Sequence, residues 1–326
     1  MAQLKLSGFQ LKPRKISLPR VQLFRKGKVI QLRFLQKLIE PQPNDVIAGE
    51  IGAFPCLGKT RDGKQIYLCQ FSSQTALLKE LGRLREVAFR AVGEGSGKSY
   101  DIDQFDFYYE HLILWDERQQ EIVGAYRLGN VQKLLKRSEY SRLYTETLFQ
   151  FNPSFDEVLS SGLELGRSFV QPKYWGNRSL DYLWYGIGAY LKYNPDIRYL
   201  FGPVSISGQL PGRAKALIVS FYASHFDNGQ NWVSPKNAYK IPKKYHEICH
   251  FGADYREEFK QLQERLKRLR LTVPTLYKQY AEVAEVGGVT FCAFNIDVDF
   301  GYCLDGFVVV DLTALKENKR KRYLGE

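Results

Sequence analysis

The stretch LELGRSFVQPKYWGNRSLDYLWYGIGAYL at residues 163–191, continued by IRYLFGPVSIS at 197–207, decides the fold of this chain. An apolar segment containing one acid, Glu164, is followed by a basic turn, a longer apolar segment and a second short apolar run. This order predicts strand, turn, helix and strand, which form a βαβ unit with parallel strands. A helix N-terminus presents unpaired N–H groups and partial positive charge, so the turn with Lys173 and Arg178 is expected to hold a phosphate.

Both predicted strands contain a residue that disturbs sheet pairing. Gly202-Pro203 falls in the middle of the second strand, and proline has no N–H to donate to a neighbouring strand. Gly166 in the first strand is a natural position for a bulge. Parallel strands that stop pairing at mid-length splay and leave a slot between them. Such a slot, ending at an anion-binding helix, suits a phosphopantetheine arm whose amides replace the missing strand partners.

This unit resembles the core of the GNAT acyltransferase superfamily, and more closely its long-chain branch that makes ornithine lipids, glycine lipids and N-acyl amino acids, whose members are sometimes labelled haemolysin-like. The motifs that carry the resemblance are LELGRS at 163–168, LWYGIGAYL at 183–191, FGPVSIS at 201–207, DIDQFDFYYEHLILWD at 101–116 and CLDGFVVVD at 303–311. The similarity covers roughly residues 76–312. It implies a mixed α/β (α+β) fold, with a central sheet flanked by helices and splayed parallel strands.

One departure from the family concerns the donor. In the loop that usually binds acetyl-CoA, Trp175 stands where the first conserved residue would fall, and Arg178 stands where a glycine would fall. The resemblance therefore implies a thioester on acyl carrier protein more than free acetyl-CoA, with no tightly bound cofactor. We expect the acyl-phosphopantetheine donor to contact Ser168, Phe169, Val170, Lys173, Gly176, Asn177, Arg178 and Ser179.

The catalytic prediction rests on the single acid of the first strand. Acylation requires an amine without its proton, and a buried carboxylate has a raised pKa that suits a base. Glu164 is our candidate, with a structural ion pair to Arg167 as the alternative, since a bulge at Gly166 would bring the two side chains onto one face. The family places a tyrosine on the next helix to protonate the departing thiolate. Tyr222 is the candidate, although Phe221 occupies the expected offset.

Further candidates concern the two substrates. Asp101, Asp103 and Asp106 either hold a cationic acceptor or are solvated turn residues. His111 and Asp116 match the His-x-x-x-x-Asp signature of glycerolipid acyltransferases. An offset of five residues in a strand places the two side chains on opposite faces, so a dyad is not expected. The remaining substrate-binding candidates are Trp175, Trp184, Ser205 and Ser207, with core packing as the alternative for the tryptophans. Asp297, Asp299 and Asp305 lack calcium-loop spacing, so no metal site is predicted.

The charge of the chain is concentrated near its N-terminus. Residues 1–40 contain ten Lys or Arg and only Glu40 as an acid, which gives +9 of the total net charge of +12. Such an arm is attracted to acidic partners, namely acyl carrier protein, anionic lipid or nucleic acid. Nucleic acid is not expected, because the arm offers only three aromatic residues. The arm is interpreted either as a docked or partly ordered segment or as a membrane-associated one, in which Phe24–Leu38 is amphipathic like an interfacial anchor.

The remaining composition predicts a cytoplasmic protein without a membrane-spanning segment. Five cysteines form no Cys-x-x-Cys pair, and the 326 residues contain no run of 18 apolar residues. We expect three parts: a basic arm with short strands around the TRDG turn over residues 1–70, the acyltransferase domain over 71–312 and a solvated basic tail over 313–326. The glycine-rich segment GEGSGKS at 93–99 follows a predicted helix, which favours a flexible loop over the active site and not a nucleotide loop.

The sequence therefore favours an N-acyltransferase that moves a long acyl chain, with or without a 3-hydroxyl, from acyl carrier protein to the amine of an amino acid such as ornithine or glycine. The product would serve aminolipid or N-acyl amino acid synthesis at the inner face of the membrane. Two alternatives remain: a transferase of the acetyl-CoA or acyl-homoserine lactone type, and a non-enzymatic basic adaptor for membrane or nucleic acid.

Overall fold

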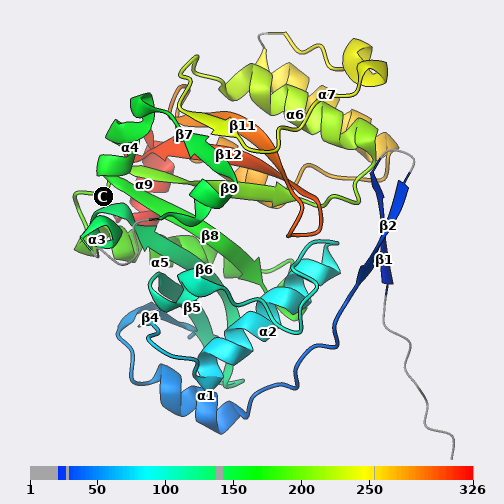
Figure 1. The fold of residues 1–326 in the computed structure, drawn as a ribbon. Helices are drawn as coiled ribbons and strands as arrows, with labels where there is room; N and C mark the ends of the chain where they lie inside the picture. The colour runs from blue at the N-terminus through cyan, green and yellow to red at the C-terminus, as the bar shows by residue number, and fades with distance from the viewer. Residues whose placement is uncertain (1–20, 27–28, 137–141, 253, 326) are drawn as a thin grey trace, which may run out of the picture.

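A computed structural model describes residues 21–26, 29–136, 142–252 and 254–325, with side chains from residue 35 onward. Its centre is an eight-stranded mixed sheet in the order β11-β12-β9-β8-β6-β5-β4-β3 (Figure 1). The strands are β3 Cys56–Lys59, β4 Gln65–Gln70, β5 Glu110–Asp116, β6 Glu121–Asn130, β8 Gly162–Val170, β9 Tyr199–Ile206, β11 Val289–Asp297 and β12 Cys303–Asp311. Only β8 and β9 pair in parallel within this sheet. The mixed α/β fold expected from the sequence is confirmed.

The predicted βαβ unit consists of β8, helix α5 (Ser179–Tyr193) and β9. Alternate strand residues such as Leu163 and Leu165 pack in the same apolar core as Leu183 and Ile187 of α5. Gly186 lets this helix lie close to the sheet, because a Cβ at this position would lie 2.7 Å from the side chain of Leu112. The unit thus joins the two halves of the sheet through one buried helix.

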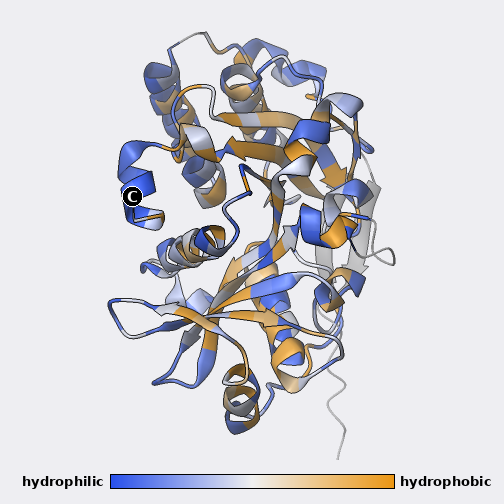
Figure 2. Ribbon diagram, turned by 90° about the vertical axis from the view of Figure 1, so that its left-hand side faces the viewer, coloured by the Kyte–Doolittle hydropathy of each residue, from blue (hydrophilic) through white to orange (hydrophobic). Residues whose placement is uncertain are grey.

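Helices cover both faces of the sheet. One face carries α5, α6 (Gly212–Phe226), α7 (Tyr255–Arg268), α8 (Thr275–Ala281) and α9 (Glu317–Tyr323) over one continuous core. The opposite face carries two smaller cores under α1 (Asn44–Ile51), α2 (Ala76–Ala91), α3 (Val131–Leu135) and α4 (Asp156–Ser160). Hydrophobic residues gather on the strands between these layers (Figure 2). We call the first face the α5 face and the second the α2 face.

Short elements complete the fold. Two small antiparallel sheets pair β1 (Val21–Lys26) with β2 (Val29–Phe34), and β7 (Phe149–Phe151) with β10 (Val233–Pro235). The 3₁₀ turns are η1 (Gln104–Phe107), η2 (Tyr144–Thr147), η3 (Pro153–Phe155), η4 (Pro172–Tyr174), η5 (Lys243–Ile248) and η6 (Leu312–Ala314). No helix among the described residues combines the length and the apolarity needed to cross a bilayer.

Both ends of the chain contain regular structure. The segment interpreted as amphipathic overlaps the β1–β2 hairpin, because Ile30, Leu32 and Phe34 alternate with polar residues at the period of a strand. Residues 1–20 and 27–28 of the basic arm lie outside the described residues. The basic tail forms α9, in which no residue is buried, and the Tyr323 ring at its end packs 5.6 Å from the Trp184 ring of α5. Strands β3 and β4, meanwhile, extend the same sheet as the predicted acyltransferase domain.

Candidate active site

The slot predicted between the parallel strands is present. β8 and β9 pair only from Gly162–Tyr199 to Glu164–Phe201 and do not pair further along. Immediately afterwards β8 bulges: two of its residues, Arg167 and Ser168, stand opposite one residue of β6, and Arg167 takes a left-handed φ of 47°. On β9, a Cβ at Gly202 would lie 2.1 Å from the Leu165 carbonyl oxygen, so only glycine fits where the strands are closest.

A pocket opens where the pairing stops. Its volume is about 540 Å³, including open solvent at its mouth. Its lining comprises Phe89, Tyr126, Tyr144, Leu165, Gly166, Arg167, Ser168, Pro203, Val204, Ser205, Leu276, Tyr280, Asp297, Phe300 and Asp305. Leu165, Val204 and Tyr280 belong to the core of the α5 face, whereas Arg167 contacts Phe300 and Tyr144 on the α2 face. The pocket therefore passes between the splayed strands and joins the two faces of the sheet.

On the α5 face the pocket ends at two tyrosines. Tyr126 of β6 and Tyr280 of α8 are both buried, and the Tyr126 hydroxyl has no hydrogen-bond partner of normal geometry within the described part of the chain. Burial raises the pKa of Tyr126, and the nearby polar groups of Ser168, Tyr280 and Trp184 oppose this rise. A buried hydroxyl without a partner normally requires an explanation, and a ligand in the pocket would supply one.

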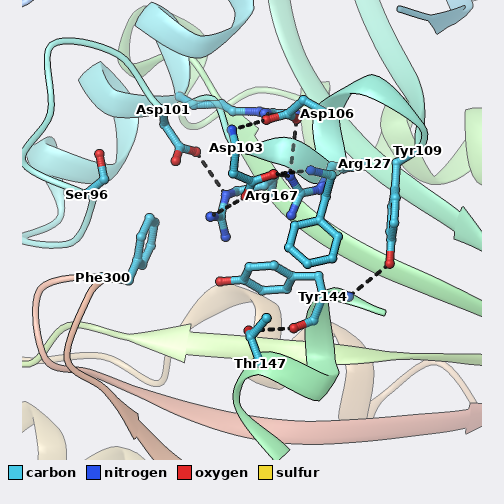
Figure 3. A network of polar contacts seen from close by, with 12 residues as sticks. Ser96, Asp101, Asp103, Asp106, Tyr109, Arg127, Tyr144, Thr147, Arg167 and Phe300 are labelled. Carbon is cyan, nitrogen blue, oxygen red and sulfur yellow. Dashed lines mark hydrogen bonds and ion pairs between the residues drawn. The ribbon is translucent and has the colours of Figure 1, made fainter. Parts of the chain in front are cut away.

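On the α2 face, three arginines meet three aspartates, and Figure 3 labels all of them except Arg85. The ion pairs are Arg85–Asp106 at 2.7 Å, Arg127–Asp103 at 2.6 Å, Arg127–Asp106 at 3.2 Å, Arg167–Asp101 at 3.0 Å and Arg167–Asp103 at 3.2 Å. Burial acts to raise the pKa of Asp106, but Arg85 and Arg127 outweigh it and hold this pKa well below its usual range. The charges of this network balance, and the ion pairs hold its side chains in place. Because Arg167 lines the pocket, we call the network the wall of the site.

Tyr144 lies against this wall. Its ring lies 4.6 Å from the Arg167 guanidinium and 5.0 Å from that of Arg127 (Figure 3). The backbone N–H of Tyr144 donates to the Tyr109 hydroxyl at 3.0 Å. Tyr109 in turn donates to Glu164, which also accepts from the Thr145 N–H at 2.8 Å. Glu164 therefore holds the η2 turn that carries Tyr144.

Several sequence predictions about this wall need correction. Glu164 does not pair with Arg167: the bulge does put both on the α2 face, but Arg167 binds Asp101 and Asp103. Glu164 is 1% exposed and does not line the pocket, and burial raises its pKa. Asp101 and Asp106 are buried, Asp103 keeps a side-chain exposure of 25%, and none of the three is free for a cationic acceptor, because the arginines already bind them.

Two further candidates are structural. His111 is fully buried between Arg85 and the Asp106 carbonyl, and burial with the Arg85 charge lowers its pKa to about 4, so it is neutral at pH 7. Tyr222 does not reach the pocket. Its ring packs against Tyr277 at 5.0 Å and Phe291 at 4.7 Å in the core of the α5 face. The helix was predicted correctly, but its tyrosine points into the protein.

The expected phosphate-binding turn is exposed and lies between β8 and α5. Lys173 pairs with Glu121, and Arg178 pairs with Asp181 at 3.1 Å. Ser179 binds the Asn177 side chain through its N–H at 2.9 Å. Exposed ion pairs of this kind contribute only about 0–1 kcal/mol, so the two cations can exchange partners at little cost.

The other predicted residues divide between the pocket and its surroundings. Ser168 and Ser205 line the pocket. Ser207 donates to the Gly93 carbonyl at 3.0 Å, which fixes the glycine-rich loop beside β9. Trp175 is exposed and donates to the Val170 carbonyl at 2.7 Å, Trp184 packs on Tyr280, and Phe169 packs on Phe89. The two tryptophans and Phe169 therefore do not line the pocket.

The glycine-rich loop is held more firmly than the sequence suggests. The Glu86 carboxylate accepts from the N–H groups of Ser96 at 3.0 Å and Gly97 at 2.7 Å. The loop also delivers Glu94, which accepts from the Ser205 hydroxyl at 2.8 Å. Sequence reasoning missed Glu94, Tyr126, Arg127, Tyr144, Tyr280, Asp297 and Asp305 as residues of the site. The usable signal was that acids such as Asp305 stand inside otherwise apolar strands.

Residues 84–185 match the family described as the acetyltransferase (GNAT) domain. This part of the chain is similar to a GNAT domain. The match begins within α2 and runs through β6 and the bulge of β8 to the first turns of α5. The resemblance inferred from the sequence motifs is confirmed.

Curated relatives match over a longer stretch. The chain is 29% identical over 305 residues to a glycine N(alpha)-acyltransferase of Bacteroides thetaiotaomicron, covering 89% of this chain and 90% of the relative. A glycine N(alpha)-acyltransferase of Phocaeicola vulgatus is also 29% identical, with 89% and 93% covered. An L-ornithine N(alpha)-acyltransferase of Brucella abortus is 29% identical over 60% of this chain and 68% of its own length. A solved structure of a CoA-dependent acyl-homoserine lactone synthase, MesI, is 12% identical with a TM-score of 0.28 over 70% of this chain and 75% of that one.

Proposed function

We propose that this protein is an N-acyltransferase that moves a long acyl chain from the phosphopantetheine thioester of acyl carrier protein to the α-amine of an amino acid, glycine before ornithine. The observation that carries the proposal is the pocket between β8 and β9, which begins where their pairing stops after Glu164 and Phe201. The glycine preference is supported by the longer match to the glycine relatives, 89% of this chain against 60% for the ornithine relative.

The donor enters, in this proposal, from the α5 face. The pantetheine amides pair with the backbone that β8 and β9 leave unpaired, and the phosphates lie at the exposed turn with Lys173 and Arg178. The thioester carbonyl then lies near Ser168, where backbone N–H groups released by the bulge stabilise the oxyanion. Tyr126 and Tyr280, and not Tyr222, are the groups placed to protonate the departing thiolate. We assign Glu164 a positioning role, because it holds the turn that carries Tyr144.

The residues around the pocket and the basic arm also support a proposal for the acyl donor and for where the protein acts. Acyl carrier protein is the proposed donor, because the turn before α5 carries Arg178 where the family's acetyl-CoA loop has glycine. The basic residues 1–40 would draw an acidic carrier protein and an anionic membrane to the cytoplasmic protein. The product would be an N-acyl amino acid for aminolipid synthesis.

The test is a product assay with the purified protein. Palmitoyl and 3-hydroxypalmitoyl thioesters of acyl carrier protein and of CoA are offered with glycine or ornithine, and N-acylated products are measured by mass spectrometry. We expect N-acylglycine, formed faster from the carrier-protein thioester. No N-acylated amino acid from any of these thioesters would contradict the proposal.

A variant that fills the slot between β8 and β9 tests whether the slot is needed for activity. A Cβ at Gly166 meets no atom within 4 Å, although Gly166 lines the pocket, so Gly166→Val should fold and place its methyl groups in the slot. We expect at least a 50-fold loss of kcat/KM for the thioester. Gly58→Val in β3 is the matched control, because a Cβ there also meets no atom within 4 Å and lies at the edge strand. Equal activity in both variants would remove the slot from the mechanism.

A further inference from the structure

The end of the pocket on the α2 face contains a second group of acids. Asp297, at the end of β11, and Asp305, near the start of β12, both line the pocket. Glu94 reaches the same place from the glycine-rich loop through its hydrogen bond to Ser205, which also lines the pocket. All three residues are buried, with 8%, 6% and 4% exposure for Glu94, Asp297 and Asp305 respectively.

These acids differ from the three aspartates of the arginine network in having no counterion. Within the described residues, none of the three has a Lys, Arg or His nitrogen within 4.0 Å. Asp297 accepts from the N–H groups of Asp299 and Phe300 in its own turn. The Asp305 Oδ2 atom accepts no hydrogen bond from any described residue, although it is buried and its residue lines the pocket. A buried carboxylate without a partner is costly, so a cation from outside the chain would relieve this site.

The cation that fits is an amine. Among the described residues, no three His, Cys, Asp or Glu side chains converge closely enough to hold a metal ion. An ammonium group needs only one or two acceptor oxygens, and the unpartnered Asp305 oxygen supplies one. Arg167 lines the same pocket, but Asp101 and Asp103 already pair with its guanidinium. The unpartnered acids therefore match the ammonium end of an α-amino acid.

We infer that Asp305, assisted by Asp297 and Glu94, binds the ammonium group of the acceptor amino acid and takes its proton. This inference rests on the proposed function and names the base that Glu164 does not supply. Asp305 lies at the opening on the α2 face, so an amine held there meets a thioester that enters from the α5 face. The two substrates then approach the slot from opposite faces of the sheet.

The reaction balances as follows. The ammonium group gives one proton to the Asp305 carboxylate and becomes a neutral amine. Its lone pair attacks the thioester carbonyl carbon, a C–N bond forms, and the C–S bond breaks. The nitrogen loses a second proton, the thiolate gains one to become a thiol, and Asp305 releases its proton to solvent. The net products are the amide, the free thiol and one proton.

The electrostatic surroundings increase the affinity of Asp305 for a proton, as a base requires. Burial raises the pKa of Asp305 well above its usual value, and the charges of Asp297 and Glu94 add to this, while Arg167 opposes it. The other titratable groups that face Asp305 are Tyr144 of η2, Tyr277 of α8 and Cys303 of β12. A base whose pKa approaches the working pH transfers protons most efficiently.

The experiment compares Asp305→Asn with wild type in steady-state kinetics from pH 7 to pH 10. At pH 7 we expect a loss of at least 100-fold in kcat/KM for glycine with little change in the KM for the thioester. The loss should shrink to about tenfold at pH 10, because an amine that is already deprotonated needs no base. Asp311→Asn is the control: Asp311 ends the same strand, pairs with Arg198 at 2.8 Å and lies away from the pocket.

Other outcomes separate the inference from the proposed function. If wild type forms N-acylglycine and Asp305→Asn keeps at least a third of its activity at pH 7, the inference is wrong and the proposed function stands. A loss that is equal at every pH also contradicts it, since a purely structural defect has that signature. Where Asp305→Asn does not fold, Glu94→Gln replaces it, with an expected loss of about tenfold that again shrinks at high pH. A Glu94→Gln variant with unchanged activity would overturn the inference.

Discussion

Two sets of acids lie at or beside one pocket, and they differ in whether an arginine pairs with them. Asp101, Asp103 and Asp106 are each held by an arginine, whereas the acids around Asp305 have no such partner among the described residues. Paired buried charges fix geometry, and unpaired ones are available to a ligand. At the scale of single residues, the paired aspartates therefore belong to the wall of the site, and the unpaired acids around Asp305 are the ones that can bind a ligand.

The free energy of unfolding should depend on pH through the unpaired acids, and Glu94 in particular. Burial raises the pKa of Glu94 to about 7, against the hydrogen bond from Ser205. A raised pKa means that the folded state holds the proton more tightly, so its stabilising contribution is complete below about pH 4.5 and is lost as pH rises through 7. Between these limits we expect the free energy of unfolding of wild type to fall by on the order of 2 kcal/mol relative to Glu94→Gln. Chemical denaturation at each pH measures this, and parallel curves for the two proteins would contradict it.

Removing the Tyr222 hydroxyl tests the correction to the thiolate acid. This hydroxyl has no hydrogen-bond partner among the described residues and lies in an aromatic core. We expect Tyr222→Phe to keep wild-type kcat within twofold and to unfold at an equal or higher temperature, because an unsatisfied buried group costs about 1–3 kcal/mol. Tyr126→Phe, made in parallel, should lower kcat. A large loss of kcat in Tyr222→Phe alone would restore that residue as the acid.

At the scale of elements, the close approach and parting of β8 and β9 create the site. The strands approach at Gly202 and separate at the β8 bulge, so one glycine sets where the slot begins. We expect Gly202→Ala to lower the free energy of unfolding by roughly 2 kcal/mol or more, because its Cβ would lie 2.1 Å from the Leu165 carbonyl oxygen. Gly166→Ala on the facing strand is the control and should change stability little. Thermal melting curves that show equal stability for both would contradict this geometry.

The sequence revealed the elements more readily than the side-chain partners. Gly166 and Gly202-Pro203 are local signals, because glycine and proline restrict what a strand can do wherever the rest of the chain lies, so the slot was predictable. The partner of Glu164 was not, because Tyr109 and Thr145 come from distant segments and no spacing links them to β8. The helix with Tyr222 was predicted, but which face of it is buried depends on α8 and β11.

At the scale of the whole molecule, the positive charge lies at one end of the chain. Residues 1–40 carry +9 and the other 286 carry +3. Gln36 and Ile39 donate to carbonyls of the glycine-rich loop, at 2.9 Å and 3.2 Å, so a truncation should spare them. Most of the basic residues of the arm precede these two residues in the sequence.

Deleting residues 1–34 tests this arrangement. We expect the KM for acyl carrier protein thioesters to rise at least tenfold at low salt, with little change for the CoA thioester, because charge attraction to an acidic partner would be lost. The difference should disappear at about 0.5 M salt, where the Debye length is only a few ångströms. Equal effects on both donors would show that the arm supports the fold and not the encounter.

The most direct test of the account is the position of the donor sulphur in a crystal structure with a non-hydrolysable thioether analogue of an acyl-CoA. We predict that the sulphur lies between the segment 165–168 of β8 and the segment 203–205 of β9, within van der Waals contact of about 4 Å of both. If β8 and β9 instead pair beyond Glu164 and Phe201, or the analogue binds elsewhere, the central claim is wrong.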